Sequence, residues 1–192
     1  MLSEKFKNHK IILASNSPRR QELLKGLDVD FLIETKEVKE LYSSDLKHSE
    51  ITEYLAKLKS DAFHNISENI IIITADTIVW FKDKALEKPK NRNEAIEMIQ
   101  QLSGNSHQVI TSVCIKSSKS QKIITDITKV YFKKLSLNEI TYYVDKYKPY
   151  DKAGSYGIQE WIGFIGVSKI EGSYFNVMGL PVHKIYQELM NL

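Results

Sequence analysis

Hydrophobic and polar positions in the first part of the chain alternate between a strand-like and a helix-like period. The short apolar run 11–15 predicts a buried strand. Helical spacing over 17–25, followed by Gly26, predicts a helix that ends at the glycine. A second strand is predicted over 28–35, and the polar stretch 36–47 is irregular. Strands and helices therefore alternate early in the chain.

The next segment combines an amphipathic helix with strongly apolar strands. Apolar residues three and four positions apart predict a helix that begins at Ser49 and buries one face. That face consists of Ile51, Tyr54, Leu55, Leu58 and Ala62. The run 70–74 predicts a fully apolar strand, and 77–81 with 85–86 predicts a hairpin that turns at 82–84.

The middle of the chain begins with a helix and continues with two longer alternating runs. Asn91 and Glu94 have the spacing of a capping box and open a helix that stops at Gly104. Alternation over 107–117 and 122–133, with a polar turn between the runs, predicts an antiparallel pair of strands.

The last third returns to helices around one further strand. A second capping box at 136–139 opens a helix that extends to about Tyr147. A strand is predicted near 164–170, and a final helix begins at Pro181. Together, these elements predict a single α/β domain over residues 1–192, with a mixed sheet and flanking helices.

Composition narrows the class of protein. With 192 residues, 42% hydrophobic and 27% charged, the chain is typical of one soluble globular domain. A net charge of only +3 argues against a dedicated duplex-binding protein. The single cysteine, Cys114, excludes an internal disulfide and lies in an alternating run that predicts burial. No apolar segment approaches the roughly 18 to 20 residues needed to span a bilayer, so we expect a cytoplasmic protein.

A serine-rich turn between the first strand and the first helix is the strongest candidate binding motif. Ser17 suits the N-cap and Pro18 the first helical position. The turn therefore gathers free N–H groups, the hydroxyls of Ser15 and Ser17, and the guanidinium groups of Arg19 and Arg20. Such a combination attracts phosphate. An ordinary turn with two solvated arginines is the alternative.

Three charged residues elsewhere in the chain could take part in binding a phosphate or in its hydrolysis. Asp76 is expected directly past the strand 70–73, where a carboxylate can hold a divalent cation or take a proton from water. Lys59 borders the buried face of its helix, and Pro89 favours an extended Lys88, so both ammonium groups can reach a phosphate. The alternatives are a turn aspartate, a lysine that covers the core, and a solvated lysine.

Two glycine-containing segments lie near the end of the chain, at 151–159 and 172–181. Gln159 closes the first, and its amide complements the C4 carbonyl and N3–H of uracil or thymine. A glutamine that only stabilises its loop is the alternative. The sequence contains no Walker-type loop, dinucleotide fingerprint, H-E-x-x-H or G-x-S-x-G motif.

Five segments of the chain resemble, in order, the motifs of the Maf family of nucleoside triphosphate pyrophosphatases. They are LASNSPRR (13–20), ADT (75–77), LSGNSHQVIT (102–111), DKAGSYGIQ (151–159) and GSYFNVMGLP (172–181). The resemblance spans nearly the whole chain. It implies an elongated α/β fold of the kind shared with inosine triphosphate pyrophosphatases, with a cleft between two lobes.

The resemblance also implies roles for individual residues. Asp76 matches the catalytic base or metal-positioning carboxylate, and Glu40 matches an acidic residue that helps to hold metal, although Lys39 stands where the family often has a second acid. The basic residues that match the family's phosphate-binding set are Arg19, Arg20, Lys59 and Lys88. Arg19, Thr77 and Gln159 together resemble the branch that acts on dTTP and UTP, and differ from the branch that acts on 7-methyl-GTP.

The expected reaction is attack of water on the α-phosphorus of dTTP or UTP, with Mg²⁺ or Mn²⁺ as the cofactor, giving a monophosphate and pyrophosphate. The resemblance further implies removal of non-standard nucleotides and a link to cell division arrest. The alternatives are the same chemistry on 7-methyl-GTP, a non-catalytic nucleotide sensor, and an RNA-binding regulator suggested by the basic balance and ten tyrosines. We expect a nucleotide partner, no nucleic acid and no membrane, and a homodimer is left open.

Overall fold

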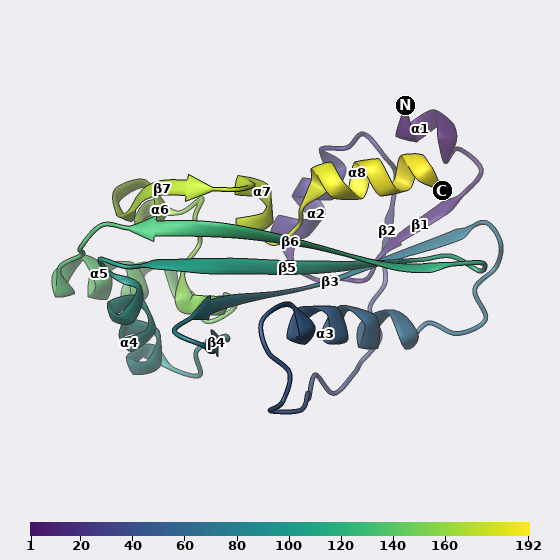
Figure 1. Cartoon of the computed structure of the whole chain (residues 1–192). Coiled ribbons are helices and arrows are strands. Elements are labelled where there is room, and N and C mark those ends of the chain that lie inside the picture. The colour runs from purple at the N-terminus through teal and green to yellow at the C-terminus, as the bar shows by residue number, and fades with distance from the viewer. The chain divides into compact units, whose positions relative to one another are not determined.

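The computed structural model describes residues 1–192 and contains one seven-stranded sheet with flanking helices (Figure 1). The strands are β1 (Lys10–Leu13), β2 (Leu32–Ile33), β3 (Ile70–Phe81), β4 (Lys84–Leu86), β5 (Ser106–Lys116), β6 (Gln121–Phe132) and β7 (Val167–Glu171). The helices are α1 (Leu2–Lys5), α2 (Pro18–Lys25), α3 (Ser49–Asp61), α4 (Arg92–Leu102), α5 (Leu137–Tyr147), α6 (Trp161–Gly166), α7 (Tyr174–Val177) and α8 (Val182–Asn191), with a 3-10 turn η1 (Ala153–Ser155).

The sheet is mixed, as predicted. Its strand order is β2-β1-β3-β5-β6-β7, with β4 paired to β3. Strand β1 runs parallel to β2 and β3, whereas β4 is antiparallel to β3 and β7 is antiparallel to β6. Only the turn 117–120 separates β5 from β6, which is too short for a parallel crossover. The predicted antiparallel pair is therefore confirmed, together with the α/β class.

The chain divides into two compact units. Unit 1 comprises residues 1–76, 111–126 and 179–192, and unit 2 comprises residues 77–110 and 127–178. The strands β3, β5 and β6 contribute residues to both units. The single domain over 1–192 and the cleft between two lobes stay predictions.

Unit 1 is built around apolar parallel strands. Ile11 of β1 pairs with Ile71 of β3, Leu13 pairs with Ile73, and all four side chains are buried. A continuous apolar run of this kind is typical of a parallel strand that is covered on both faces. Helices α2 and α3 add the buried leucines and isoleucines of their inner faces: Leu23, Leu24, Ile51 and Leu55.

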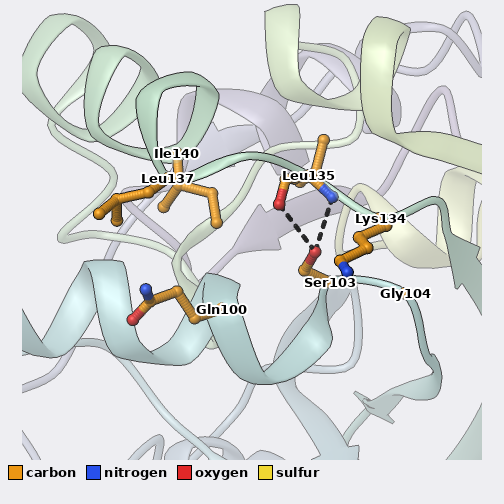
Figure 2. A pocket seen from close by; sticks show the side chains of 7 residues that line it. All are labelled: Gln100, Ser103, Gly104, Lys134, Leu135, Leu137 and Ile140. Carbon is orange, nitrogen blue, oxygen red and sulfur yellow. Dashed lines mark hydrogen bonds between the residues drawn. The ribbon is translucent and has the colours of Figure 1, made fainter.

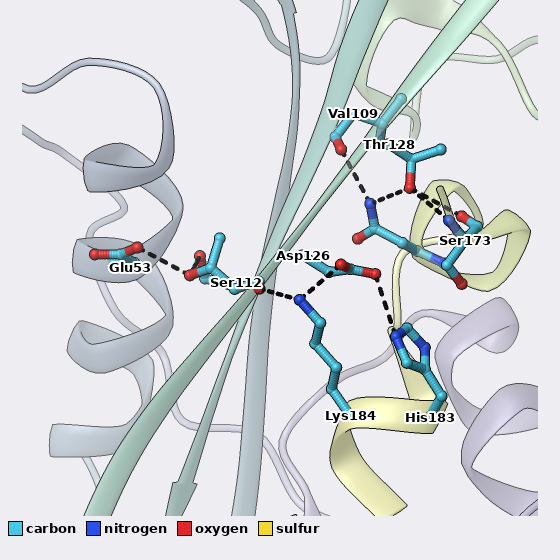
Figure 3. A network of polar contacts seen from close by, with 10 residues as sticks. Glu53, Val109, Ser112, Asp126, Thr128, Ser173, His183 and Lys184 are labelled. Atoms are coloured by element: carbon cyan, nitrogen blue, oxygen red, sulfur yellow. Dashed lines mark hydrogen bonds and ion pairs between the residues drawn. The ribbon is translucent and has the colours of Figure 1, made fainter. Parts of the chain in front are cut away.

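A network of polar contacts holds helix α8 against β6 within unit 1. The ammonium group of Lys184 lies 2.7 Å from Asp126 Oδ1 and also donates to the Thr125 carbonyl at 2.7 Å (Figure 3). His183 Nε2 lies 3.8 Å from the other oxygen of Asp126. The end of α8 also contacts the N-terminal segment: Lys5 of α1 donates to the Met190 carbonyl, so the two termini lie side by side.

Unit 2 packs helices α4 and α5 on its part of the sheet. The helices contact each other through residues that are fully buried, among them Ile99, Leu102 and Val144. The α5 capping box is confirmed in both directions, because the Ser136 side chain accepts from the Glu139 N–H and the Glu139 carboxylate accepts from the Ser136 N–H.

The α4 start confirms half of the predicted capping box. Asn91 accepts a hydrogen bond from the Glu94 N–H, as an N-cap should. The Glu94 carboxylate, however, accepts from the Lys90 N–H and not from Asn91. The helix ends at Leu102, and Gly104 follows with a positive φ of 71°.

The last glycine-containing segment is anchored by Asn176 within unit 2. Its side-chain amide donates to the Val109 carbonyl at 3.0 Å and to Thr128 Oγ1 at 2.9 Å. The Thr128 hydroxyl in turn donates to the Ser173 carbonyl at 3.1 Å (Figure 3). A Cβ on Gly172 would meet Thr128 Oγ1 at 2.7 Å, so this contact requires glycine.

Three predicted strands differ from the observed ones. The predicted break after 70–74 is wrong, because β3 continues to Phe81; the Thr74 hydroxyl donates to the Ala56 carbonyl at 2.6 Å, so a polar residue is satisfied inside the strand. The predicted strand 28–35 shrinks to Leu32–Ile33, since Asp28 adopts a left-handed conformation after α2. The predicted strand 164–170 begins only at Val167.

Helix α6 replaces the start of that last strand. Short apolar runs fit a strand or a helix equally well, and here hydrogen bonds from Gly163 and Phe164 N–H groups to the Glu160 carbonyl select the helix.

Cys114 is buried, as predicted. No helix in the structure is both long enough and apolar enough to cross a membrane.

Candidate active site

The turn before α2 has the predicted form. Ser17 has an extended backbone, and Pro18 occupies the first helical position. The Ser17 side chain makes no capping hydrogen bond; instead its N–H donates to Ser15 Oγ at 3.3 Å, and Gln21 Nε2 donates to the Ser15 carbonyl. Buried Ser15 therefore shapes the turn, and no side chain caps the helix N-terminus.

Arg20 joins three segments of unit 1. Its Nε donates to the Gly179 carbonyl at 2.9 Å and its Nη1 to the Ala75 carbonyl at 2.8 Å. Burial lowers the pKa of the guanidinium, and nearby Asp76 only partly opposes this change. An arginine side chain nevertheless stays charged in proteins. Arg20 thus has a structural role that the sequence did not reveal, and its predicted phosphate-binding role stays a prediction.

Lys59, Asp76 and Glu40 form the central charged cluster of unit 1. The Lys59 ammonium lies 2.6 Å from Asp76 Oδ1 and 2.9 Å from Glu40 Oε2. The side chains of Lys59 and Asp76 are only 16% and 12% exposed, whereas that of Glu40 is 49% exposed. Asp76 lies in the middle of β3, which corrects the predicted position past the strand end.

The electrostatic surroundings of Asp76 favour proton uptake. Burial raises the pKa of its carboxyl group, Lys59 and Arg20 oppose that rise, and Glu40 adds to it. The net shift is upward, so the carboxylate is a stronger base than an aspartate in water. A buried carboxylate with a raised pKa suits general-base chemistry.

The cluster also fits one kind of metal binding. The described residues include no group of three or more His, Cys, Asp or Glu side chains that could hold a metal ion. Mg²⁺ is commonly held by one or two carboxylates together with substrate phosphates and waters. Asp76 and Glu40, which share the Lys59 ammonium, fit a cation held jointly with a phosphate better than a resident metal centre.

The remaining predicted residues lie in different surroundings. Arg19 is half-buried in the first turn of α2. In unit 2, Thr77 is half-buried on β3, Lys88 is exposed after β4, and Gln159 is half-buried beside the buried Ile158. That these four residues meet one substrate stays a prediction.

Sequence reasoning missed a buried charge in the glycine-rich segment 151–159. The Lys152 side chain is 9% exposed and forms ion pairs with Asp151 and Glu160. A Cβ on Gly154 would meet Val79 Cγ2 at 2.7 Å, and its φ is 66°, which explains that glycine. Lysine among small residues was the available signal, but its partners cannot be read from spacing.

A separate hollow of about 420 Å³ lies in unit 2 between the end of α4 and the start of α5 (Figure 2). Its lining residues are Gln100, Ser103, Gly104, Lys134, Leu135, Leu137 and Ile140. Ser103 Oγ accepts from the Leu135 N–H at 2.7 Å and closes one wall. None of the predicted site residues lines this hollow, and it contains no carboxylate.

The sequence matches one protein family over nearly its whole length. A family model described as Maf-like protein matches residues 10–192. The chain is 56% identical to the dTTP/UTP pyrophosphatase of Flavobacterium johnsoniae, with all of both chains covered, and 53% identical to the dTTP/UTP pyrophosphatase of Bacteroides thetaiotaomicron, with 96% of each covered. The structure of the Staphylococcus aureus Ham1 protein matches with a TM-score of 0.48 and 16% identity, over 64% of this chain and 71% of that chain.

Proposed function

This chain belongs to the Maf family, and from that membership we propose that it hydrolyses dTTP and UTP to the monophosphate and pyrophosphate. Identity above one half, over the full length, to proteins named dTTP/UTP pyrophosphatase is the observation that carries this proposal. The chain is accordingly a hydrolase of acid anhydrides. A cytoplasmic location, where the nucleotide pool is used, is part of the proposal.

Asp76 is the proposed general base. It takes a proton from water as the water oxygen bonds to the α-phosphorus, and the bond from that phosphorus to the bridging oxygen of the β-phosphate breaks. Pyrophosphate then leaves with the bridging electron pair. The raised pKa of the Asp76 carboxyl group and its burial in the middle of β3 support this role.

Lys59 is proposed to connect the carboxylates with the phosphates. A lysine ammonium has three N–H donors, and the two contacts to Asp76 and Glu40 leave one of them for a phosphate oxygen. Arg19, Arg20 and Lys88 are the other proposed phosphate-binding cations, and the hydroxyls of Ser15 and Ser17 and the uncapped N-terminus of α2 supply further donors.

A divalent cation, Mg²⁺ or Mn²⁺, is the proposed cofactor, with Asp76 and Glu40 as its protein ligands. When bound, it supplies charge neutralisation on the phosphates and polarises the reacting phosphoryl group. Gln159, together with Arg19 and Thr77, is proposed to select the pyrimidine. The proposed partner is therefore a nucleotide, without nucleic acid or membrane, and the oligomeric state is left open.

A hydrolysis panel tests the proposal. Purified protein is incubated with UTP, dTTP, GTP and 7-methyl-GTP, with and without Mg²⁺ or Mn²⁺, and the products are separated. We expect UMP, dTMP and pyrophosphate in the presence of metal. Release of orthophosphate contradicts attack at the α-phosphorus, a preference for 7-methyl-GTP contradicts the substrate class, and binding without turnover identifies a nucleotide sensor.

A further inference from the structure

The loop that carries Gln159 is fastened to α5 through one tyrosine hydroxyl. The Tyr143 O–H donates to Glu160 Oε2, and the Tyr143 hydroxyl oxygen accepts from the Gly157 N–H at 3.0 Å. Tyr143 is fully buried. Burial raises the pKa of its phenol and Glu160 raises it further, so the hydroxyl remains a donor at any physiological pH.

The second carboxylate oxygen of Glu160 forms an ion pair with Lys152, which precedes the loop segment 157–160. The Lys152 ammonium lies 3.1 Å from Glu160 Oε1 and 2.8 Å from Asp151 Oδ1. The side chains of Lys152 and Glu160 are 9% and 19% exposed. Both carboxylate oxygens of Glu160 are therefore paired with groups that are largely shielded from water.

Backbone contacts close the loop around the same side chain. The Glu160 N–H donates to the Gly157 carbonyl at 3.0 Å. A Cβ on Gly157 would meet Glu160 Cδ at 2.7 Å, so the glycine allows the carboxylate to approach the main chain. Between these two residues lie buried Ile158 and half-buried Gln159. Gln159 thus lies in a loop segment whose two ends, Gly157 and Glu160, both hydrogen-bond to the Tyr143 hydroxyl.

Such an arrangement is expensive if stability is its only purpose. Burying an ion pair requires the desolvation of both charges, and apolar replacements are often as stable. A fixed donor and acceptor, in contrast, are what recognition of a base edge needs, because a site built to hydrogen-bond one partner rejects another only when its polar groups cannot rearrange.

We propose that Tyr143, Lys152 and Glu160 are positioning residues that hold the Gln159 amide in the orientation that selects a pyrimidine triphosphate. This inference rests on the proposed function and explains how the site would select its substrate. The three side chains do not touch the substrate; they act through Gln159. All of these residues belong to unit 2, so the inference needs no assumption about how the units are arranged.

The test compares Tyr143→Phe and Glu160→Gln with the control Tyr147→Phe. Tyr147 stacks on Tyr143 in the same helix, and it is not part of the Glu160 network. Tyr143→Phe removes both hydrogen bonds of the hydroxyl. We expect it to lower kcat/KM for UTP by about five- to tenfold, and kcat/KM for GTP by less than about twofold. Tyr147→Phe should leave both values within about twofold of the parent.

A double-variant cycle separates positioning from general damage. In a Gln159→Leu background the amide is already gone, so Tyr143→Phe should lower kcat/KM for UTP by less than about twofold further. Full additivity of the two changes overturns the proposal, as does an equal loss on UTP and GTP that follows the loss in Tm. Glu160→Gln provides a second reading if Tyr143→Phe folds poorly.

Amide hydrogen exchange supplies a readout without turnover. Tyr143→Phe should accelerate exchange at Gly157 and Glu160 while the α4 and α5 amides keep their protection. Unchanged exchange at the loop overturns the proposal. A parent protein that turns over no UTP refutes the proposed function itself, whereas UTP turnover with an unaffected UTP-to-GTP ratio in every variant refutes only the positioning role.

Discussion

The pKa of the Asp76 carboxyl group is set by burial and by neighbouring charges that act in opposite directions. Its burial in β3 disfavours the charged form, whereas Lys59 and Arg20 favour it. The pKa of the Asp76 carboxyl group is raised, so it has a higher affinity for a proton than a solvated aspartate has.

Asp76→Asn should keep the fold and abolish most turnover. The amide has the same shape, but it can neither take a proton nor supply a negative charge to a metal. General-base removal typically costs about 10²- to 10⁴-fold in rate. The measurement is UMP release at saturating Mg²⁺, with Asp83→Asn as the control, since Asp83 is exposed in the β3–β4 turn and its φ of 57° suits asparagine. Activity within a few-fold of the parent would exclude Asp76 as the base.

Arg20 and Lys88 should respond differently to neutralisation. Arg20→Met leaves the Ala75 and Gly179 carbonyls without their donor, so we expect unfolding to become easier by about 1.5 to 3 kcal/mol in addition to lost activity. Lys88→Met removes an exposed charge and should change stability by less than about 0.5 kcal/mol while raising KM for UTP. Urea unfolding and steady-state kinetics on both variants check this. Equal destabilisation by both substitutions would contradict the distinction.

His107 should make the stability of the protein depend on pH. Its Nε2 lies 2.7 Å from the Tyr156 hydroxyl, Nδ1 has no hydrogen-bond partner, and burial lowers its pKa from 6.5 to about 3. Between these values the unfolded chain binds a proton that the folded protein does not. The free energy of unfolding therefore falls as pH falls from 6.5 toward 3, by up to about 1.4 kcal/mol per pH unit.

His107→Gln removes this contribution. We expect the difference in unfolding free energy between pH 7 and pH 5 to be smaller in the variant than in the parent, because the carboxylates contribute equally to both. Urea unfolding at the two pH values gives the comparison. Identical differences in the two proteins would show that His107 titrates alike in the folded and unfolded states.

At the scale of elements, helix α5 depends on its N-terminal capping box. Ser136 Oγ accepts from the Glu139 N–H, and the Glu139 carboxylate accepts from the Ser136 N–H at 2.7 Å. Ser136→Ala should therefore lower the free energy of unfolding by about 1 kcal/mol. Thermal and urea unfolding measure it, and Ser120→Ala in the β5–β6 turn is the surface control. No difference between the two variants would mean that the cap contributes nothing.

Local signals explain which elements could be predicted. The capping residues of α5, the proline at the first position of α2 and the alternation of β5 and β6 act within a few residues, so these elements could be predicted. Helix α6 was missed because a short apolar run fits a strand or a helix equally well. The predicted start of β7 failed for the same reason. The continuity of β3 was missed because the polar Thr74 is satisfied by a tertiary hydrogen bond to the Ala56 carbonyl.

In the candidate site, too, the residues could be identified from the sequence, whereas their tertiary contacts could not. Lys59 and Asp76 were singled out from their positions, and Glu40 from the family resemblance; the structure brings all three to one ammonium group. The contacts of Arg20 with Gly179, and of Glu160 with Tyr143, join residues far apart in the chain. No periodicity encodes such contacts, so they became visible only in the folded structure.

For the whole molecule, the shift in Tm on ligand binding should distinguish a cation that is bound only together with the nucleotide from a cation that the protein binds on its own. Two carboxylates without a third ligand hold Mg²⁺ weakly, whereas a triphosphate completes the coordination. Mg²⁺ alone should therefore shift Tm by less than about 1 °C, and a non-hydrolysable UTP analogue alone should shift it modestly, because Lys59 remains paired with Asp76 and Glu40.

Mg²⁺ and the analogue together should stabilise more than the sum of the two. At a free concentration of about 100 times Kd, binding adds about 2.7 kcal/mol to the unfolding free energy. For a chain of this length that corresponds to roughly 5 to 10 °C in Tm. Asp76→Asn should abolish the excess over additivity and keep part of the shift from nucleotide alone, since the phosphate-binding cations remain. A shift with Mg²⁺ alone as large as that with both ligands would instead indicate a resident metal centre and contradict the joint site.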